Sequence, residues 1–474
     1  MKITHVSMAP TQAATQAGRP ALTPELLAAT GARYSRSDEG LEAILAKINH
    51  NEPDKSVEQI FKFVDYGHQS IADMAPVALF IDGISLYLAY YLWTLCPTAG
   101  GQESSTRYIK MDESGLVDPD TLGISGELQE EWQGRMRDAF GAYHAALTHW
   151  ENEVRLEPSL ARIPETLRND SSEKAQKAVK RMERNYAFDR ARYFLPVAAK
   201  TNVMLVQPGR AWVTLVQHLL SSLSKEARLL GHLIKPELAL CIPHLMRHAT
   251  QQESLVKGME EEFRAAQWHM MSHSTLQDEP SVRSDHPAIP RLEVYTPTNG
   301  FNRVIAFDLA YHDTRYAYIG QTLKRTSVRF GWDAVAFAEL RDLNRHRTGT
   351  KYALLFPMGF YGALDELPTK GLGFTAAYHD DLRRHVRIGH AASERALELL
   401  QKGDTTYIYH TLLGTQFPFE HTTTADKFIY EAELRTGTGA HYRYAQHFHG
   451  VLALWYERYP ETRGRILEGS AEPE

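Results

Sequence analysis

The chain has 474 residues, which is long enough for two or three domains that each bury a core of their own. Hydrophobic residues make up 43% of the sequence and aromatic residues 10%, so a disordered protein is excluded. The formal net charge is -6 and the pI is about 6.4, which excludes a global basic field that would attract nucleic acid or an anionic membrane. Any phosphate must therefore be held by local arginines, and a small phosphorylated ligand fits better than a polymer.

The number of cysteines and the first ten residues indicate the cellular compartment in which the protein is expected. Cys96 and Cys241 are too few for a disulfide scaffold or for a cysteine-based zinc site. The first ten residues contain no apolar signal core. We therefore expect a cytoplasmic protein with reduced thiols.

Local signals place the first elements of the chain. Residues 1–21 predict a strand followed by a loose arm. Thr23 as a helix cap, Pro24 at the first helical position and Gly31 as a stop predict a short helix. Another helix is expected over residues 57–66, before a polar turn.

The apolar run over residues 77–96 is about the length of a membrane span. Asp82 and Gly83 lie near its middle, and its flanks carry no clear positive-inside bias. We therefore expect a helix buried in a large core, and no membrane segment.

The middle of the chain is mostly helical in pattern. Residues 102–108 place an acid, hydroxyls and an arginine within seven positions, and amphipathic helix is expected over residues 124–190. Pro208-Gly209-Arg210 opens a further long helix. Residues 276–291 contain three prolines and alternating charges, so we interpret them as a linker between two halves.

The second half begins with strand-like runs at residues 291–295 and 303–307, followed by a helical stretch over residues 315–323. Residues 337–344 predict an amphipathic helix that runs into Arg345-His346-Arg347 and a turn of small residues. The remaining expected elements are a loop over residues 352–361, helices over 376–401, a helix that ends at 434–435 and a last helix from 441.

The Arg345-His346-Arg347 cluster has two interpretations when it is taken alone. Two guanidinium forks that flank an imidazole can aim several donors at one anionic group. The same cations are also favoured at the solvated C-terminal end of a helix. The first half of the chain shifts the weight toward the first interpretation, because it resembles the remainder of the same site.

Several segments of the first half occur in the order found in one enzyme family. The matching segments are Arg33-Tyr-Ser35, Gly67-His68-Gln-Ser70, Glu103 with Ser105, Arg107 and Tyr108, Ala191-Arg192-Tyr-Phe-Leu195-Pro196, Thr201, Arg210, and Glu226-Ala-Arg228. Together they resemble the flavin-dependent thymidylate synthases, the ThyX family. The first half departs from that family where its signature has Arg-His-Arg, because Leu95-Cys96-Pro97 stand there, and Gly100 replaces the first signature serine.

The second half resembles a more divergent copy of the same family. Arg345-His346-Arg347 and Thr350 restore what the first copy lost, whereas Leu355 and Pro357 stand where the later signature Ser and Arg would be. Leu434-Arg435 followed by Ala440-His441 resembles a later family pattern, and Tyr318 to Gly320 fall where His68 would be. The losses of the two copies are therefore complementary.

The resemblance implies an α+β fold of two ThyX-like lobes, each a sheet with long packed helices. The expected domains are residues 1–275 and 292–474, joined by the linker at 276–291. Family members are homotetramers whose sites combine neighbouring subunits, so the resemblance implies a homodimer that forms a pseudo-tetramer.

The family methylates C5 of dUMP with methylenetetrahydrofolate, while FAD supplies hydride and NADPH reduces the flavin. The resemblance implies flavin-side residues His68, Ser70, Arg345, His346 and Arg347, and nucleotide-side residues Glu103, Ser105, Arg107, Arg210 and Arg228. Among these, Arg228, His68 and Arg345 are the expected catalytic residues. No nucleophilic cysteine is needed, which suits two thiols in apolar contexts.

Two alternatives stay open. One is methylation of another pyrimidine nucleotide in a specialised pathway, and the other is a flavin- or nucleotide-binding homologue without catalysis. His244 and His248 have the i,i+4 spacing of a helical metal pair but lack a third ligand in sequence. His447 and His449 are an equally weak metal signal. We therefore expect no metal site. Gly437-Thr-Gly439 is expected to be a helix end.

Overall fold

The computed structural model describes the whole chain except residues 39, 49–52, 66–68, 107–111, 275–282, 285–286, 298–303, 368–375 and 470–474. It divides into two compact units. The first contains residues 1–105, 115–125 and 199–264, and the second contains residues 106–114, 126–198 and 265–474. The expected α+β class is confirmed, because each unit contains its own sheet together with helices.

The first unit is built on a sheet of four antiparallel strands. In spatial order these are β1 (Lys2–Val6), β2 (Pro76–Ser85), β4 (Lys200–Pro208) and β3 (Gly100–Glu103). The helices α5 (Leu86–Leu95), α10 (Gly209–Ser221) and α11 (Lys225–Ala239) follow these strands in the chain, and α2 (Pro24–Tyr34), α4 (Pro53–Asp65) and η1 (Gln69–Met74) precede β2. The strand and helix side chains share one apolar core, in which Leu79, Leu205 and Trp212 are fully buried.

The single helix expected over residues 77–96 is wrong in its first half. Residues up to Ser85 form the central strand β2, and only the remainder forms α5. A central strand is apolar on both faces, so its sequence cannot be told from that of a buried helix by periodicity. Gly83 (φ 74°) lies at a register shift next to Asp82, and the side chain of Ser85 caps the helix that follows. No helix among the described residues is long and apolar enough to cross a membrane.

Two other helix predictions for this unit need correction. The helix α2 continues through Gly31 to Tyr34. The helix that opens at Gly209 ends at Ser221, and α11 begins after Ser224, whose hydroxyl accepts a hydrogen bond from the Ala227 amide. Serine competes with helical backbone bonding and favours such a cap, so one expected helix becomes two.

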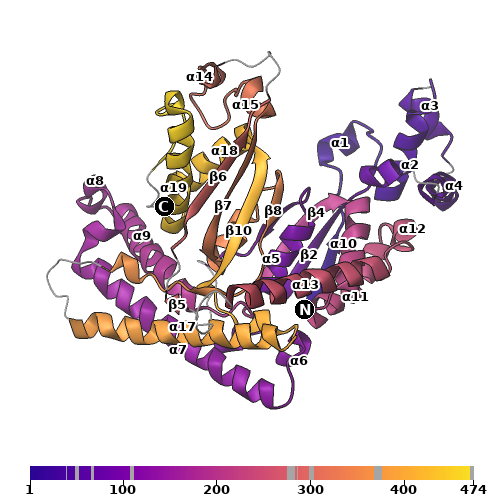
Figure 1. Cartoon of the computed structure of the whole chain (residues 1–474). Helices are drawn as coiled ribbons and strands as arrows, with labels where there is room; N and C mark the ends of the chain where they lie inside the picture. The colour runs from indigo at the N-terminus through magenta and orange to yellow at the C-terminus, as the bar shows by residue number, and fades with distance from the viewer. Residues whose placement is uncertain are drawn as a thin grey trace. The chain divides into compact units, whose positions relative to one another are not determined.

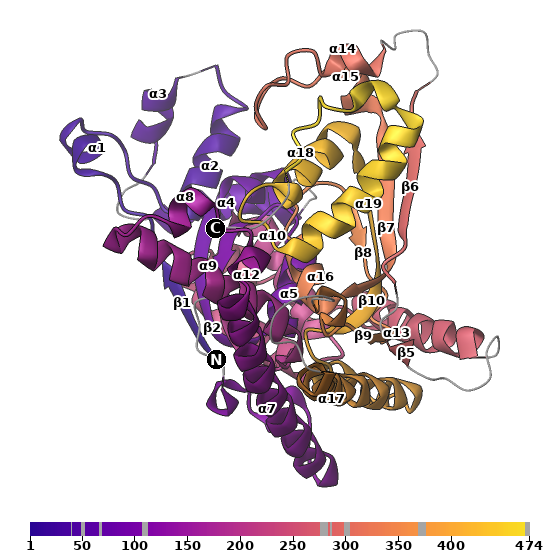
Figure 2. The same ribbon diagram turned by 90° about the vertical axis from the view of Figure 1, so that its left-hand side faces the viewer.

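The second unit contains a six-stranded sheet and most of the long helices. Its spatial strand order is β5 (Arg283–Ser284), β9 (Gly359–Phe360), β10 (Thr415–Thr424), β7 (Ser327–Ala336) and β6 (Pro290–Tyr295), and β8 (Thr350–Tyr352) also pairs with β10. The helices α18 (Ala425–Thr436) and α19 (Tyr442–Arg458) pack on β6, β7 and β10, as Figures 1 and 2 show. Phe330 and Trp332 of β7 meet Phe428 and Phe448 of these helices.

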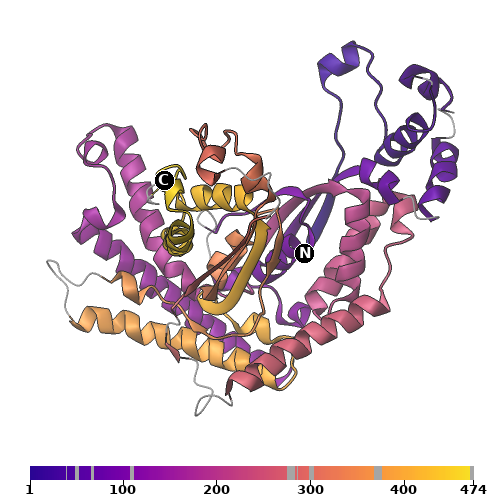
Figure 3. The same cartoon turned by 45° about the horizontal axis from the view of Figure 1, so that its top comes forward.

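Long helices of the same unit lie together on its other side. The helix α7 (Glu127–Leu156) packs against α9 (Glu173–Ala191) and α17 (Ala376–Gln401), and Figure 3 shows α17 in orange alongside α7 in magenta. The expected strand at residues 303–307 is wrong, because residues 305–308 form the helical turn α14. The helical stretch expected over 315–323 lies later, as α15 (Gln321–Arg325).

The two sheets repeat one strand order. The order β1-β2-β4-β3 of the first unit corresponds to β6-β7-β10-β8 of the second, with antiparallel pairing at every step. The strands β2 and β7 are both ten residues long, and each runs directly into a helix, α5 or α16 (Phe337–Leu343). This correspondence supports an internal duplication. The domain boundaries given by sequence stay a prediction, and residues 126–198 group with the second unit.

The segments that precede β4 and β10 pair with each other inside the second unit. The Val197 amide donates to Thr411 O at 3.2 Å, and the Leu413 amide donates to Leu195 O at 2.8 Å, on either side of a bridge between Pro196 and Leu412. Each segment thus contacts its own counterpart in the other half of the duplication.

Candidate functional site

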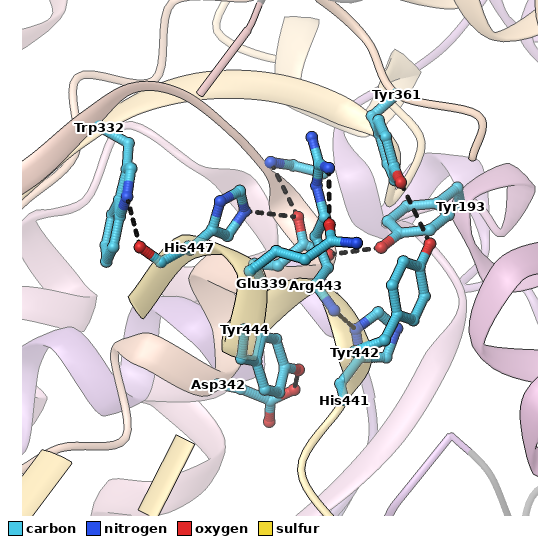
Figure 4. A network of polar contacts seen from close by, with 12 residues as sticks. Tyr193, Trp332, Glu339, Asp342, Tyr361, His441, Tyr442, Arg443, Tyr444 and His447 are labelled. Atoms are coloured by element: carbon cyan, nitrogen blue, oxygen red, sulfur yellow. Dashed lines mark hydrogen bonds and ion pairs between the residues drawn. The ribbon is translucent and has the colours of Figure 1, made fainter. Parts of the chain in front are cut away.

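The helix α16 carries the candidate cluster, and its N-terminus is held by a buried carboxylate. Glu339 has no exposed surface, and its Oε2 accepts the Ala336 amide at 3.1 Å. Its Oε1 accepts the Tyr193 hydroxyl at 2.8 Å, and Nε2 of His447 lies 3.9 Å from Oε2 (Figure 4). Burial raises the pKa of Tyr193 well above its usual range, so its phenol stays a donor. These contacts fix the direction in which α16 enters the cluster.

At the C-terminal end of α16, Asp342 gathers cationic and phenolic partners. The Tyr444 hydroxyl donates to Asp342 Oδ2 (Figure 4), and Nη2 of Arg192 donates to the same hydroxyl at 3.1 Å. Nη1 of Arg345 lies 3.5 Å from Asp342 Oδ1. Burial alone would raise the pKa of Asp342, but the nearby guanidinium groups, that of Arg345 foremost, lower it to about 2. Asp342 is therefore ionised over the whole physiological range.

The imidazole of His346 is neutral. Arg435 donates from Nε to His346 Nε2 at 2.8 Å and from Nη2 to Asp342 O at 2.7 Å. Burial lowers the pKa of His346 to about 3, despite the Glu431 carboxylate 3.4 Å away. Because Nε2 accepts from a guanidinium, the ring proton is assigned to Nδ1. His346 can thus offer one neutral donor, while the positive charge of the cluster comes from its arginines.

A second histidine supports this arrangement from β10. Nδ1 of His421 lies 3.0 Å from Glu431 Oε2, and its Nε2 lies 2.7 Å from Thr348 O. Lys351 donates to His346 O, and burial lowers the pKa of Lys351. The backbone between these residues turns at Gly349 (φ 70°), where an added Cβ would lie 2.1 Å from Thr422 O, so only glycine fits. The expected small-residue turn after the cluster is confirmed.

The three cluster residues differ in accessibility. His346 is almost enclosed, Arg345 is about one-third exposed, and Arg347 is exposed. The guanidinium groups of Arg345 and Arg347 therefore reach the surface, and the neutral imidazole between them is enclosed and bonded to Arg435. This arrangement can bind an anionic or electron-rich heterocycle edge.

Aromatic hydroxyls extend the same buried network. Tyr361 and Tyr442 share a hydrogen bond of 3.2 Å, and Tyr361 also donates to Asp365 at 2.8 Å. The Arg443 guanidinium lies 4.1 Å from the centroid of the Tyr361 ring and donates to Asp365 at 3.0 Å. Figure 4 shows Tyr193, Tyr361 and Tyr442 near Glu339 and Arg443. The network stiffens the elements that carry the cluster.

Sequence reasoning missed the buried partners of the cluster. Glu431 and Arg435 lie one turn apart on α18, on its buried side, and His421 takes a buried alternate position of β10 after Phe417 and Phe419. An ionisable residue at an inward position of an amphipathic pattern is the signal that could have found them.

In the first unit, Arg210 and Asp73 form a bidentate pair. The distances are 2.7 Å from Nε to Oδ1 and 2.5 Å from Nη2 to Oδ2, and both side chains are more than one-third exposed. Arg210 lies at the start of α10, where backbone amides also point outward.

The other predicted residues of this unit lie on separate elements. Nη1 of Arg228 donates to Ser222 O at 2.6 Å and to Leu223 O at 2.9 Å. Glu103 ends β3 and is buried, Ser105 follows it, and Ser70 is exposed in η1. His68 and Arg107 lie outside the described residues. Their roles stay predictions.

Glu226, two residues before Arg228, has a structural task. Its Oε1 accepts the Ser85 amide at 2.8 Å and its Oε2 accepts the Ser85 hydroxyl at 2.6 Å. Glu226 has no exposed surface. It therefore holds the N-terminus of α5, as Glu339 holds that of α16.

Residues 21–244 match the family model described as thymidylate synthase complementing protein. The first half of the chain therefore matches the family that its sequence segments resemble, the ThyX family. A UPF0159 protein of Thermoplasma acidophilum is 25% identical over 238 residues, which cover 46% of this chain and 48% of that relative. A UPF0159 protein of Chlamydia pneumoniae is 24% identical over 371 residues, which cover 67% of each chain. The chain thus spans about half the length of the first relative and two-thirds of the second.

Two solved structures are similar to about half of this chain. The UMP/dUMP methylase PolB from Streptomyces cacaoi, bound with 5-Br dUMP, is 14% identical with a TM-score of 0.31, and the match covers 52% of this chain and 93% of that one. ThyX from Helicobacter pylori with FAD and dUMP is 16% identical with a TM-score of 0.30, and the match covers 54% of this chain and 100% of that one.

The two thiols are kept protonated by burial, and one of the histidines with helical metal-pair spacing contacts a glutamate. Burial raises the pKa of Cys96 to about 12 and that of Cys241 to about 11, so neither is an activated nucleophile. Nδ1 of His244 lies 2.7 Å from Glu25 Oε2. Within the described ranges, no three His, Cys, Asp or Glu side chains are grouped to hold a metal ion.

Proposed function

We propose that the chain is an FAD-dependent enzyme of the thymidylate synthase type, which methylates C5 of dUMP or a related uridine nucleotide. Methylenetetrahydrofolate would donate the carbon, and NADPH would reduce the flavin. The observation that carries the proposal is the repeated sheet. At the end of the helix that follows β2 and β7, one copy has Leu95-Cys96-Pro97 and the other has Arg345-His346-Arg347.

The flavin side of the proposed site belongs to the second unit. FAD, once reduced, would supply hydride to the transferred carbon. Arg345 and Arg347 would hold the anionic pyrimidine edge of the reduced flavin, because both guanidinium groups reach the surface beside a neutral imidazole. His346 would donate from Nδ1, since Arg435 occupies Nε2. This donor set fits an electron-rich ring edge.

The nucleotide side belongs to the first unit. Arg210, released from Asp73, would bind the phosphate together with Ser105 and Arg107. Arg228 would approach the uracil edge, with Glu103 supporting the arginines. His68 and Ser70 would contact the flavin from this unit. Because family sites combine neighbouring subunits, we propose a homodimer in which domains 1–275 and 292–474 each act as one family subunit.

Product formation tests this function. The purified chain is incubated without oxygen with dUMP, methylenetetrahydrofolate, FAD and NADPH, and the nucleotides are separated by mass. The expected product is dTMP. UMP and other uridine nucleotides are tested in parallel, and a methylated product from one of these alone would assign the chain to another pyrimidine nucleotide.

Two variants make the test specific. Arg210→Ala is expected to raise KM for the nucleotide by about tenfold, the loss of one charge-assisted contact. Arg383→Ala removes an exposed guanidinium that pairs with Asp380 on α17 and is the matched control. Flavin binding without any methylated product would contradict the proposed enzymatic activity and favour a flavin-binding homologue without catalysis.

A further inference from the structure

The second unit displays a cluster of exposed aromatic rings that the proposed function does not use. Phe307, Tyr311, Tyr316 and Tyr318 are exposed by 66%, 80%, 82% and 58%. Phe307 lies in α14, and the three tyrosines lie between α14 and α15. The ring of Tyr316 lies 6.2 Å from that of Tyr430 on α18. We call Tyr311, Tyr316, Tyr318 and Tyr430 the tyrosine platform. A group of exposed aromatic rings on one segment is typical of an interaction site, whereas single exposed rings need no explanation.

The segment that carries the platform is firmly anchored. Asp308 is buried, its Oδ2 accepts the Leu323 amide at 2.9 Å, and its backbone oxygen accepts the Gly320 amide at 2.9 Å. Nε2 of His312 lies 2.7 Å from Glu433 Oε1, and neither side chain is exposed. The rings are therefore held outward by a fixed backbone, which lowers the entropy lost when a ligand stacks on them.

Cations accompany the rings. Nζ of Lys324 lies 5.1 Å from the centroid of the Tyr318 ring. Residues 304–325 also contain Arg325, and Asp313 is their only exposed carboxylate. Arg315 of the same segment instead donates from Nη2 to Glu433 O at 3.1 Å. A locally positive surface on a chain of net charge -6 selects anions. Rings beside cations are the combination that stacks a base and binds its phosphate.

The segment that carries the platform corresponds in sequence to the segment of the first half that contains His68, a predicted flavin-side residue. The ten residues of β7 correspond one for one to those of β2, so Tyr318, Ile319 and Gly320 occupy the positions that precede β2 as Gly67, His68 and Gln69. The second copy therefore has no histidine there and carries tyrosines around that position.

We propose that the tyrosine platform binds a nucleoside phosphate, with the base stacked on Tyr316 and Tyr430 and the phosphate beside Lys324. This site goes beyond the proposed methylation, because it lies in the second unit and needs neither flavin nor Arg210. Base stacking on an aromatic side chain tolerates any base, so the platform accepts purine and pyrimidine nucleotides alike.

Equilibrium binding of a fluorescent etheno-AMP probe, with unlabelled AMP and UMP as competitors, tests the site. The variant Tyr316→Leu keeps an apolar side chain but removes the ring, and it is expected to weaken binding by about tenfold. Lys324→Gln is expected to weaken binding about threefold and to reduce its salt dependence. Tyr295→Leu is the control, because Tyr295 lies on β6, outside the platform, and is similarly exposed, at 61%.

Three results would overturn the proposal. One is etheno-AMP affinity that is the same in Tyr316→Leu and the wild type, with both folded by circular dichroism. Another is a change from dimer to monomer in Tyr316→Leu with unchanged AMP binding, which would assign the platform to a protein interface. The third is a single-stranded oligonucleotide that binds far more tightly than AMP. Arg210→Ala separates this site from the proposed nucleotide site, since platform binding must persist in that variant even if methylation fails.

Discussion

The ends of α5 and α16 take the same place in two sheets of the same strand order, yet they differ completely in chemistry. After α5 the chain buries Cys96, and burial holds the pKa of that thiol near 12. After α16 it gathers Arg345, His346 and Arg347 over Asp342 and Glu431. In one copy this position is part of the apolar core, and in the other it is a charged cluster.

This difference teaches how a duplicated fold can divide one task. Both helices pack on their sheets with buried apolar residues, and both N-termini are held by a buried glutamate. Under the proposed function the polar ends can differ, because one set of donors suffices for each bound group. The first unit retains the exposed Arg210 and Asp73 pair instead.

The largest effect is expected for Asp342→Ala. It leaves the guanidinium groups of Arg345 and Arg192 without the carboxylate that they share, and removal of one member of a buried charged set costs about 3 kcal/mol of unfolding free energy. Urea unfolding measures the loss. Asp380→Ala on α17 removes an exposed partner of Arg383 and is expected to cost less than about 0.5 kcal/mol. Equal losses in the two variants would show that the cluster is not held by its charges.

The second-largest effect is expected on the rate of flavin reduction, which should depend on the end of α16 and not on the end of α5. His346→Ala is expected to lower the rate of flavin reduction by about 100-fold, the loss of one preorganised donor. Cys96→Ala, at the equivalent end in the first unit, is expected to leave that rate within about twofold. Stopped-flow absorbance with NADPH measures both rates. A loss of stability in His346→Ala with a normal rate in the folded fraction would favour a purely structural cluster.

The pH dependence of stability sharpens the comparison further. The pKa of His346 is about 3 in the folded chain, below the ordinary value of 6.5, so the unfolded chain binds more protons between these values. Stability therefore falls as pH drops below about 6.5, by up to about 1.4 kcal/mol per pH unit from this residue. His346→Gln is expected to flatten the slope between pH 6 and 4 in urea titrations. Cys96→Ser must leave the slope unchanged, since its thiol does not titrate there.

The smallest effect concerns the exposed pair of the first unit. A double-mutant cycle on Arg210 and Asp73 is expected to give a coupling below about 1 kcal/mol, because both side chains are hydrated. Asp73→Asn is nevertheless expected to tighten dUMP binding severalfold by freeing Arg210, as calorimetry would show. Weaker dUMP binding in Asp73→Asn would assign Asp73 to the nucleotide site itself.

Much of the architecture could be predicted from local chemistry. Thr23 and Pro24 marked the start of α2, the pattern of residues 376–401 gave α17, and residues 291–295 gave β6. The failure at residues 77–96 has a physical cause, because a strand with apolar residues on both faces has the same composition as a buried helix. The choice depends on the neighbours β1 and β4, which come from distant parts of the chain.

The candidate site was predictable only in its outward part. Arg345-His346-Arg347 stand together in sequence, so a motif could identify them. Their partners Glu431 and Arg435 lie more than 80 residues away, and only folding brings them within 3.4 Å and 2.8 Å of His346. The neutral state of His346 follows from that enclosure, so a sequence that shows three cationic residues misses it.

The absorption spectrum of the purified chain, before and after anaerobic addition of NADPH, tests the central claim most directly. The division of labour between the two helix ends predicts a bound flavin that bleaches with NADPH in the wild type and in Cys96→Ala, and that is lost or inert in His346→Ala. A colourless wild-type chain that takes up no added FAD would contradict the role assigned to Arg345, His346 and Arg347.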